Sequence, residues 1–149
     1  MLIKIYLYFF IYAFLGWCTE VIYAALIEGR FINRGFLNGP YCPIYGVGVI
    51  AVVKILMPIH NNLFLLFFGS VFITSIIELF TGFILEKIFN HKWWDYSDKP
   101  FNIGGYICPL FSLMWGIGCL VVVDKIHPMI SELVSFIPDM PAIFILNIL

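Results

Sequence analysis

Two glutamates, Glu20 and Glu78, lie near the ends of long apolar segments and are the residues best suited to chemistry. A charged side chain at the bilayer centre costs about 2.5–3.5 kcal/mol on insertion scales, so it must face protein or water and be paired, hydrated or protonated. Counted along helices, Glu20 lies about 27 Å from Leu2 and Glu78 about 22 Å from Leu63. We interpret the pair as a proton-, cation- or solute-linked site. The alternative is that each glutamate only accepts hydrogen bonds from a polar loop and holds it in place.

The sequence after each glutamate is similar, which predicts an internal duplication. A second glutamate follows eight residues later in both copies, at Glu28 and Glu86. The landmarks of the first copy continue with Phe31, Cys42-Pro43, Gly46, Gly48, Lys54 and Pro58, and those of the second with Phe89, Cys108-Pro109, Gly116, Gly118, Asp124 and Pro128. Within a single domain, 1–149, we expect repeat one at about 9–58, repeat two at about 67–128 and an apolar tail at 129–149.

Arg34 and two Cys-Pro pairs are further candidates for this site. A guanidinium can bridge two carboxylates or hold a phosphate, so Arg34 is expected to pair with Glu20 or Glu78, or to contact a lipid head group. The alternative is that Arg34 only supplies positive charge at the membrane surface. Proline suits the first turn of a helix, so Cys42-Pro43 and Cys108-Pro109 are predicted to begin helices. Their partly positive N-termini would point toward the glutamates.

Two polar loops are expected to support the site. The supporting residues are Asn33, Gly39 and Pro40 in the first loop and Trp94 and Asp95 in the second. Aromatic residues fit the membrane interface, and the charged residues beside them predict a folded cap. The four cysteines lack the spacing of a metal site, and no hydrolase or ATPase motif occurs. No metal, no cofactor and no catalytic residue is therefore predicted.

Composition predicts an all-α membrane protein. The chain is 62% hydrophobic and 11% charged, whereas soluble domains have about 25% charged residues. Mean hydropathy is +1.02, and a net charge of −1 offers nothing to attract nucleic acid. The apolar segments predict helices at about 2–27, 44–57, 63–85 and 106–123, the last ended by Asp124-Lys125 and His127-Pro128. Residues 129–137 are expected to lie on the interface, and a partial fifth helix in the tail would bring the transmembrane helices from four to five.

Each predicted repeat has two spanning helices, so the two copies are expected to share one topology, related by an axis along the membrane normal. Both polar loops then lie on one face of the membrane. Five Lys and Arg residues surround the loops and three lie on the opposite side. This asymmetry predicts a multi-pass protein of the cell membrane with cytoplasmic loops.

Three long motifs carry a resemblance to a known family. They are FLGWCTE at 14–20, FINRGFLNGPYCPIYGVG at 31–48 and WWDYSDKPFNIGGYICPLFSLMWG at 93–116. Together they resemble one bacterial family, the ABC-transporter type IV or CmpB-like membrane proteins. The family pattern matches Glu20, Arg34, Gly39, Pro40, Cys42, Pro43, Trp94, Asp95 and Pro100. The resemblance implies a small multi-pass membrane protein and, for an ABC permease, an ATPase on a separate chain.

We therefore expect a small transporter or permease subunit whose site lies between two repeats at Glu20, Glu78 and Arg34. The alternatives are a lipid-handling membrane enzyme or lipid-binding protein, and an accessory protein that transports nothing. An enzymatic activity is not the favoured interpretation. Membrane lipids are expected partners, together with a second copy or a partner membrane subunit, because four or five helices make a thin wall for a solute path. The sequence names no substrate.

Overall fold

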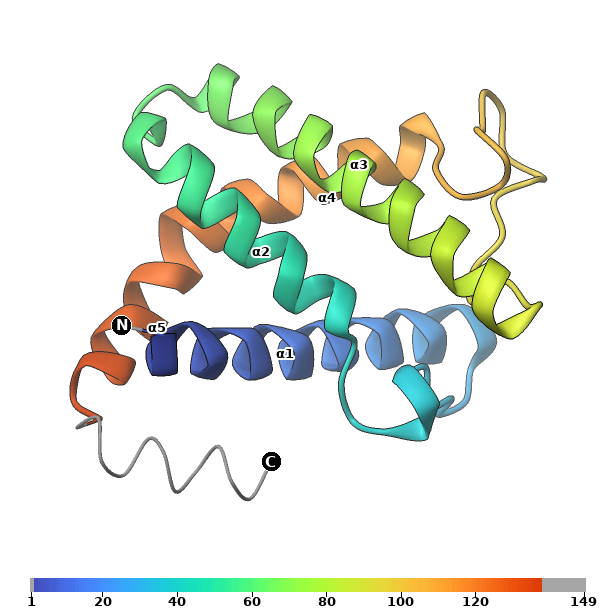
Figure 1. The fold of residues 1–149 in the computed structure, drawn as a ribbon, viewed down its shortest axis with the longest axis horizontal. Coiled ribbons are helices and arrows are strands. Elements are labelled where there is room, and N and C mark those ends of the chain that lie inside the picture. Colours follow the sequence, from blue (N-terminus) through green and yellow to red (C-terminus); the bar gives the residue numbers. More distant parts are fainter. Residues whose placement is uncertain (1, 138–149) are drawn as a thin grey trace. The chain divides into compact units, whose positions relative to one another are not determined.

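A computed structural model describes residues 2–137 as helices joined by loops (Figure 1). The helices are α1 (Leu2–Glu28), α2 (Pro43–Leu56), α3 (Leu63–Phe89), α4 (Pro109–Val121) and α5 (His127–Ser135), with 3-10 turns at Phe36–Asn38 and Met57–Ile59 and a π-helical segment at Val122–Ile126. Within the described residues, the only β-type pairing is one bridge between Ile103 and Ile107. The all-α prediction is confirmed for this part of the chain.

Within residues 2–137, three helices are long and apolar enough to cross a membrane, by length and composition. They are Ile3–Glu28, Leu63–Phe89 and the continuous helical run Pro109–Ser135. α2 has 14 residues, so it is only about 21 Å long, shorter than the ~30 Å hydrocarbon core. The apolar segments around Glu20 and Glu78 are thus membrane-type helices, whereas a total of four or five spans stays a prediction.

The predicted end of the fourth helix at Asp124-Lys125 and His127-Pro128 is wrong. The helical run continues through Val122–Ile126 into α5 and ends at Ser135. A proline inside a helix has no N–H, and its ring clashes with the carbonyl four residues earlier. The wider π turn lies just before Pro128, where the His127 N–H donates to the carbonyl of Val122, and such turns relieve a local mismatch of this kind. Residues 129–135 therefore extend a helix, while the rest of the predicted tail, 138–149, lies outside the described residues.

The helix ends follow from local chemistry. Asn62 caps α3 by accepting a hydrogen bond from the Leu65 N–H at 3.1 Å. After the last helical residue, Phe89, Asn90 forms the C-cap with a left-handed φ of 53°, and its N–H donates to the Glu86 carbonyl. Both arrangements satisfy backbone groups that a helix terminus leaves without partners. Pro43 and Pro109 are the first residues of α2 and α4, which confirms the helix starts expected from the two Cys-Pro pairs.

The described residues belong to two compact units: within this part of the chain, unit 1 covers 2–50 with 128–137, and unit 2 covers 51–127. In unit 1, the Tyr8 hydroxyl of α1 donates to Ser131 Oγ of α5 at 3.2 Å. In unit 2, α3 and α4 pack against each other. The hydrophobic core of unit 2 is formed by Val52, Leu56, Leu66, Cys119 and Val123. The predicted repeats divide the chain at other positions, and the duplication with its symmetry axis stays a prediction.

Candidate functional site: carboxylates paired with tyrosines

Glu78 is a buried carboxylate of α3, with 3% of its surface exposed. It belongs to a row of buried residues spaced four apart along that helix: Leu66, Ser70, Thr74, Glu78 and Gly82. The Tyr96 hydroxyl donates to Glu78 Oε1 at 3.0 Å. The Tyr96 ring stacks on Phe111 of α4, with ring centroids 4.5 Å apart and an interplanar angle of 12°. Helix α4 therefore orients the tyrosine that contacts the buried carboxylate.

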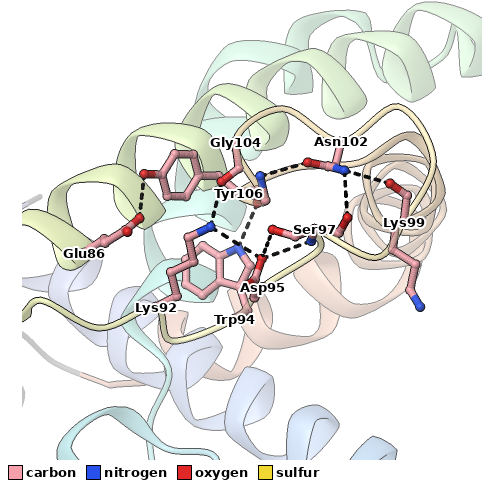
Figure 2. Close-up of polar contacts among 10 residues, drawn as sticks. Glu86, Lys92, Trp94, Asp95, Ser97, Lys99, Asn102, Gly104 and Tyr106 are labelled. Atoms are coloured by element: carbon pink, nitrogen blue, oxygen red, sulfur yellow. Dashed lines mark hydrogen bonds and ion pairs between the residues drawn. The ribbon is translucent and has the colours of Figure 1, made fainter.

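Tyr96 belongs to residues 91–107, a segment between α3 and α4 that we name the cap. The cap is folded by its own hydrogen bonds (Figure 2). The Tyr96 N–H donates to the Gly105 carbonyl at 2.8 Å, and the Trp94 indole N–H donates to the Tyr106 carbonyl at 2.8 Å. The Asn102 side chain donates to the Lys99 carbonyl and accepts from the Gly105 N–H. This network fixes the loop that carries Tyr96.

Asp95, a predicted supporting residue, stabilises a turn of the cap. Its Oδ1 accepts from the Ser97 N–H at 3.0 Å and from the Ser97 hydroxyl at 2.5 Å. Lys92 Nζ lies 3.5 Å from the same oxygen and donates to the Gly104 carbonyl at 2.9 Å. These contacts, the Ser97 hydroxyl above all, lower the pKa of Asp95. Asp95 thus acts on the shape of the cap and stays ionised at neutral pH.

A second tyrosine attaches the cap to α3 closer to the end of that helix. The Tyr106 hydroxyl donates to Glu86 Oε2 at 2.6 Å (Figure 2). This hydrogen bond, followed by burial, raises the pKa of Tyr106. Gly82 lies one helical turn from both glutamates of α3. A Cβ placed there would meet Tyr106 at 3.0 Å and Trp94 at 3.1 Å, so the two rings lie directly on the glycine.

Glu20 of unit 1 is half-buried, and its partner comes from a helix. The Tyr45 hydroxyl donates to Glu20 Oε1 at 2.6 Å. Tyr45 is in the first turn of α2 and packs on Gly16 of α1. The Cys42 N–H donates to the Ala13 carbonyl at 2.9 Å, which holds the start of α2 against α1. The helix start predicted to approach Glu20 does so through a tyrosine side chain.

Arg34 forms its ion pair with Glu28, at 3.3 Å between Nη2 and Oε1. Sequence reasoning expected a pairing with Glu20 or Glu78, but Glu28 ends α1 only six residues before Arg34. Arg30 Nη2 also lies 3.6 Å from Glu28. These side chains are more than one-third exposed, Glu28 the least at 35%, so the pairs contribute little to stability.

The first loop is organised by Asn33. Its Oδ1 accepts from the Trp17 indole N–H at 2.7 Å and from the Gly35 N–H at 2.9 Å. Gly39 continues the turn, with its N–H donating to the Phe36 carbonyl, and Pro40 follows. Cys42, the last residue before α2, is buried, and burial followed by the nearby Glu20 raises its pKa to about 11. Asn33 thus has a direct structural role, whereas Gly39 and Pro40 only shape the loop.

Two side chains central to this arrangement, Tyr45 and Tyr96, were missed by sequence reasoning. Tyr45 carries a usable signal, since it stands two residues after Pro43 in a helix start already expected near Glu20. The same position after Pro109 is Phe111, which has no hydroxyl. The hydroxyl that contacts Glu78 belongs instead to Tyr96, which lies 15 residues before Phe111 in the chain. No spacing in the sequence predicts that Tyr96 takes this role.

The chain belongs to the family described as "Putative ABC-transporter type IV", whose model matches residues 7–149. The resemblance of the three sequence motifs is thereby confirmed. No curated protein and no solved structure matches the chain. Together with the three apolar helices, the family makes this a membrane protein of a transport-related family.

Membership of this family gives the carboxylate–tyrosine pairs a chemical context. A tyrosine hydroxyl can donate to a carboxylate and can accept from a carboxylic acid, so one geometry suits both protonation states. A carboxylate buried in a membrane helix is costly unless it is paired or protonated. The Tyr96 hydroxyl supplies such a partner to Glu78. The arrangement suits a group that takes up and releases a proton without moving.

Proposed function

We propose that this protein is a small transporter or permease subunit in which movement of the transported species is linked to protonation of Glu78. The observation that carries the proposal is the buried position of Glu78 in a membrane-type helix, with the Tyr96 hydroxyl 3.0 Å from its carboxylate. Glu20 has a comparable partner in Tyr45 but is only half-buried. Glu78 is therefore the primary site and Glu20 the secondary one.

Burial supports a functional reading over a purely structural one. Ion-pair networks can also perturb buried acids, yet an ionisable residue in a transmembrane helix marks a proton or ion path more often than a structural contact. A glutamine would satisfy the same hydrogen bond at lower desolvation cost, because its carbonyl can accept from Tyr96. A carboxylate at this position is explained by its ability to change charge.

The test is proton flux in liposomes that contain the purified protein and a trapped pH-sensitive dye. A potassium gradient with valinomycin imposes a membrane potential. We expect flux above that of protein-free liposomes, a fall of tenfold or more in Glu78→Gln, and a much smaller fall in the matched variant Glu20→Gln. Infrared titration of the same samples should show a protonated carboxyl band that Glu78→Gln removes. Equal flux and equal bands in wild type and Glu78→Gln would eliminate the proposal.

A further inference from the structure

The cap contacts the face of α3 that carries both Glu78 and Glu86. These glutamates are eight residues apart, or about 12 Å along the helix axis. The residue midway between them is Gly82, which is buried. Along this face, Tyr96 contacts the inner carboxylate, Tyr106 contacts the outer one, and the rings of Trp94 and Tyr106 cover the glycine between them. The rings therefore separate the more accessible carboxylate from the buried one.

We propose that the cap is a gate on the loop-side approach to Glu78, in which Trp94 and Tyr106 seated on Gly82 form the seal and the Tyr106–Glu86 hydrogen bond forms the latch. The role of such a gate in transport rests on the proposed function. Control of water access to Glu78 by the cap does not depend on that function. A methyl group at residue 82 would require both rings to shift by a few tenths of an ångström, so the glycine lets the seal close fully.

The hydrogen bonds inside the cap, and those between the cap and α3, suit a gate that moves as one body. The internal network joins residues of the cap to one another through Trp94, Asn102 and Lys92 (Figure 2). The backbone N–H of Tyr96, which donates to the Gly105 carbonyl, also belongs to this network. Such a network allows the segment to move as one body. Two tyrosine hydroxyls of the cap donate hydrogen bonds to glutamates of α3, Tyr96 to Glu78 and Tyr106 to Glu86. Loss of the Tyr106 bond would therefore favour the open state without unfolding the cap.

Cys108 is a natural reporter for opening, because it joins the cap to α4 and is only 2% exposed. The test uses a protein whose other cysteines, Cys18, Cys42 and Cys119, are replaced by alanine. In lipid nanodiscs, the rate of reaction of Cys108 with a charged, membrane-impermeant methanethiosulfonate is measured. Tyr106→Phe keeps the ring and removes the latch, so we expect a rate about tenfold higher, in line with loss of one hydrogen bond to a carboxylate.

The matched control is Tyr45→Phe, which removes a carboxylate–tyrosine bond in unit 1 and should leave the Cys108 rate unchanged. Gly82→Ala, whose added Cβ would press on both rings, should raise the rate severalfold with the latch intact. Equal Cys108 rates in wild type, Tyr106→Phe and Gly82→Ala would overturn the gate.

A second measurement avoids the cysteine replacements. Wild type and Tyr106→Phe are treated with a water-soluble carbodiimide and glycine methyl ester, and the modification of Glu78 and Glu20 is counted by mass spectrometry. Tyr106→Phe should increase modification of Glu78 severalfold and leave Glu20 unchanged. No increase at Glu78 would count against the gate. These outcomes are independent of proton flux, so an intact gate with Glu78→Gln still conducting protons would reject the proposed function alone.

Discussion

The carboxylate–tyrosine pairs of Glu20 and Glu78 take their hydroxyl donors from different kinds of element, a helix and a loop. In unit 1, Glu20 is half-buried and its donor, Tyr45, is part of helix α2. In unit 2, Glu78 is buried and its donor, Tyr96, belongs to the cap. A donor in a helix moves only with that helix, whereas a donor in a loop can leave when the loop moves. Under the proposed function, this difference is the reason why Glu78 is the primary site and Glu20 the secondary one.

The largest expected contrast between the pairs comes from removing each carboxylate. Glu78→Ala takes away the buried acceptor of the Tyr96 hydroxyl, which should lower the free energy of unfolding by about 1–3 kcal/mol, with a further cost for the cavity. Glu20→Ala should cost only about 0.5–1.5 kcal/mol, because its surroundings are partly exposed. Unfolding in mixed micelles by a denaturing detergent measures both values. A larger loss in Glu20→Ala than in Glu78→Ala would reverse the comparison.

A double variant that moves the hydroxyl donor from the cap to α4 tests the difference between a helix donor and a loop donor. Tyr96→Phe should lower the free energy of unfolding by about 0.5–1.5 kcal/mol through loss of one hydroxyl. Phe111 stacks on Tyr96 and occupies the place after Pro109 that Tyr45 occupies after Pro43. Adding Phe111→Tyr should therefore restore most of the loss by moving the donor onto α4, as in unit 1. If the double variant is no more stable than Tyr96→Phe, the two helix starts are not equivalent.

The smallest expected effect concerns the turns of the two loops. Asn33 accepts from the N–H two residues later, at Gly35, and Asp95 does the same with Ser97, but only Asp95 titrates. Its pKa is lowered from an ordinary value of about 3.9, so its stabilising contribution is present above that value and is lost as pH falls through the lowered pKa.

Hydrogen exchange of the Ser97 amide measures this pH effect. Protection relative to the Gly35 amide should decrease on acidification below about pH 4, and Asp95→Asn should abolish the decrease because an amide does not titrate. The Gly35 amide, bonded to Asn33, corrects for the intrinsic pH dependence of exchange. A decrease that persists in Asp95→Asn would assign it to another group.

Much of the architecture is evident from local sequence. The apolar segments that contain Glu20 and Glu78 are long enough to predict membrane helices, because hydropathy and length are properties of a single segment. Pro43 and Pro109 mark helix starts, since proline suits the first turn wherever the helix later packs. The family follows from three contiguous motifs. The limit of such local rules is shown by Pro128, where a π turn carries the helix past the expected end.

The partners of the glutamates were decided by tertiary structure. Arg34 has the charge to pair with Glu20, yet it is paired with Glu28, while a neutral tyrosine from α2 contacts Glu20. The donor to Glu78 comes from a loop 18 residues away, and it depends on stacking against α4. Sequence by itself determined which segments are apolar, where helices begin and which carboxylates they carry. Only packing decided which hydroxyl each carboxylate meets, because a contact between distant residues depends on how whole helices and loops fit together.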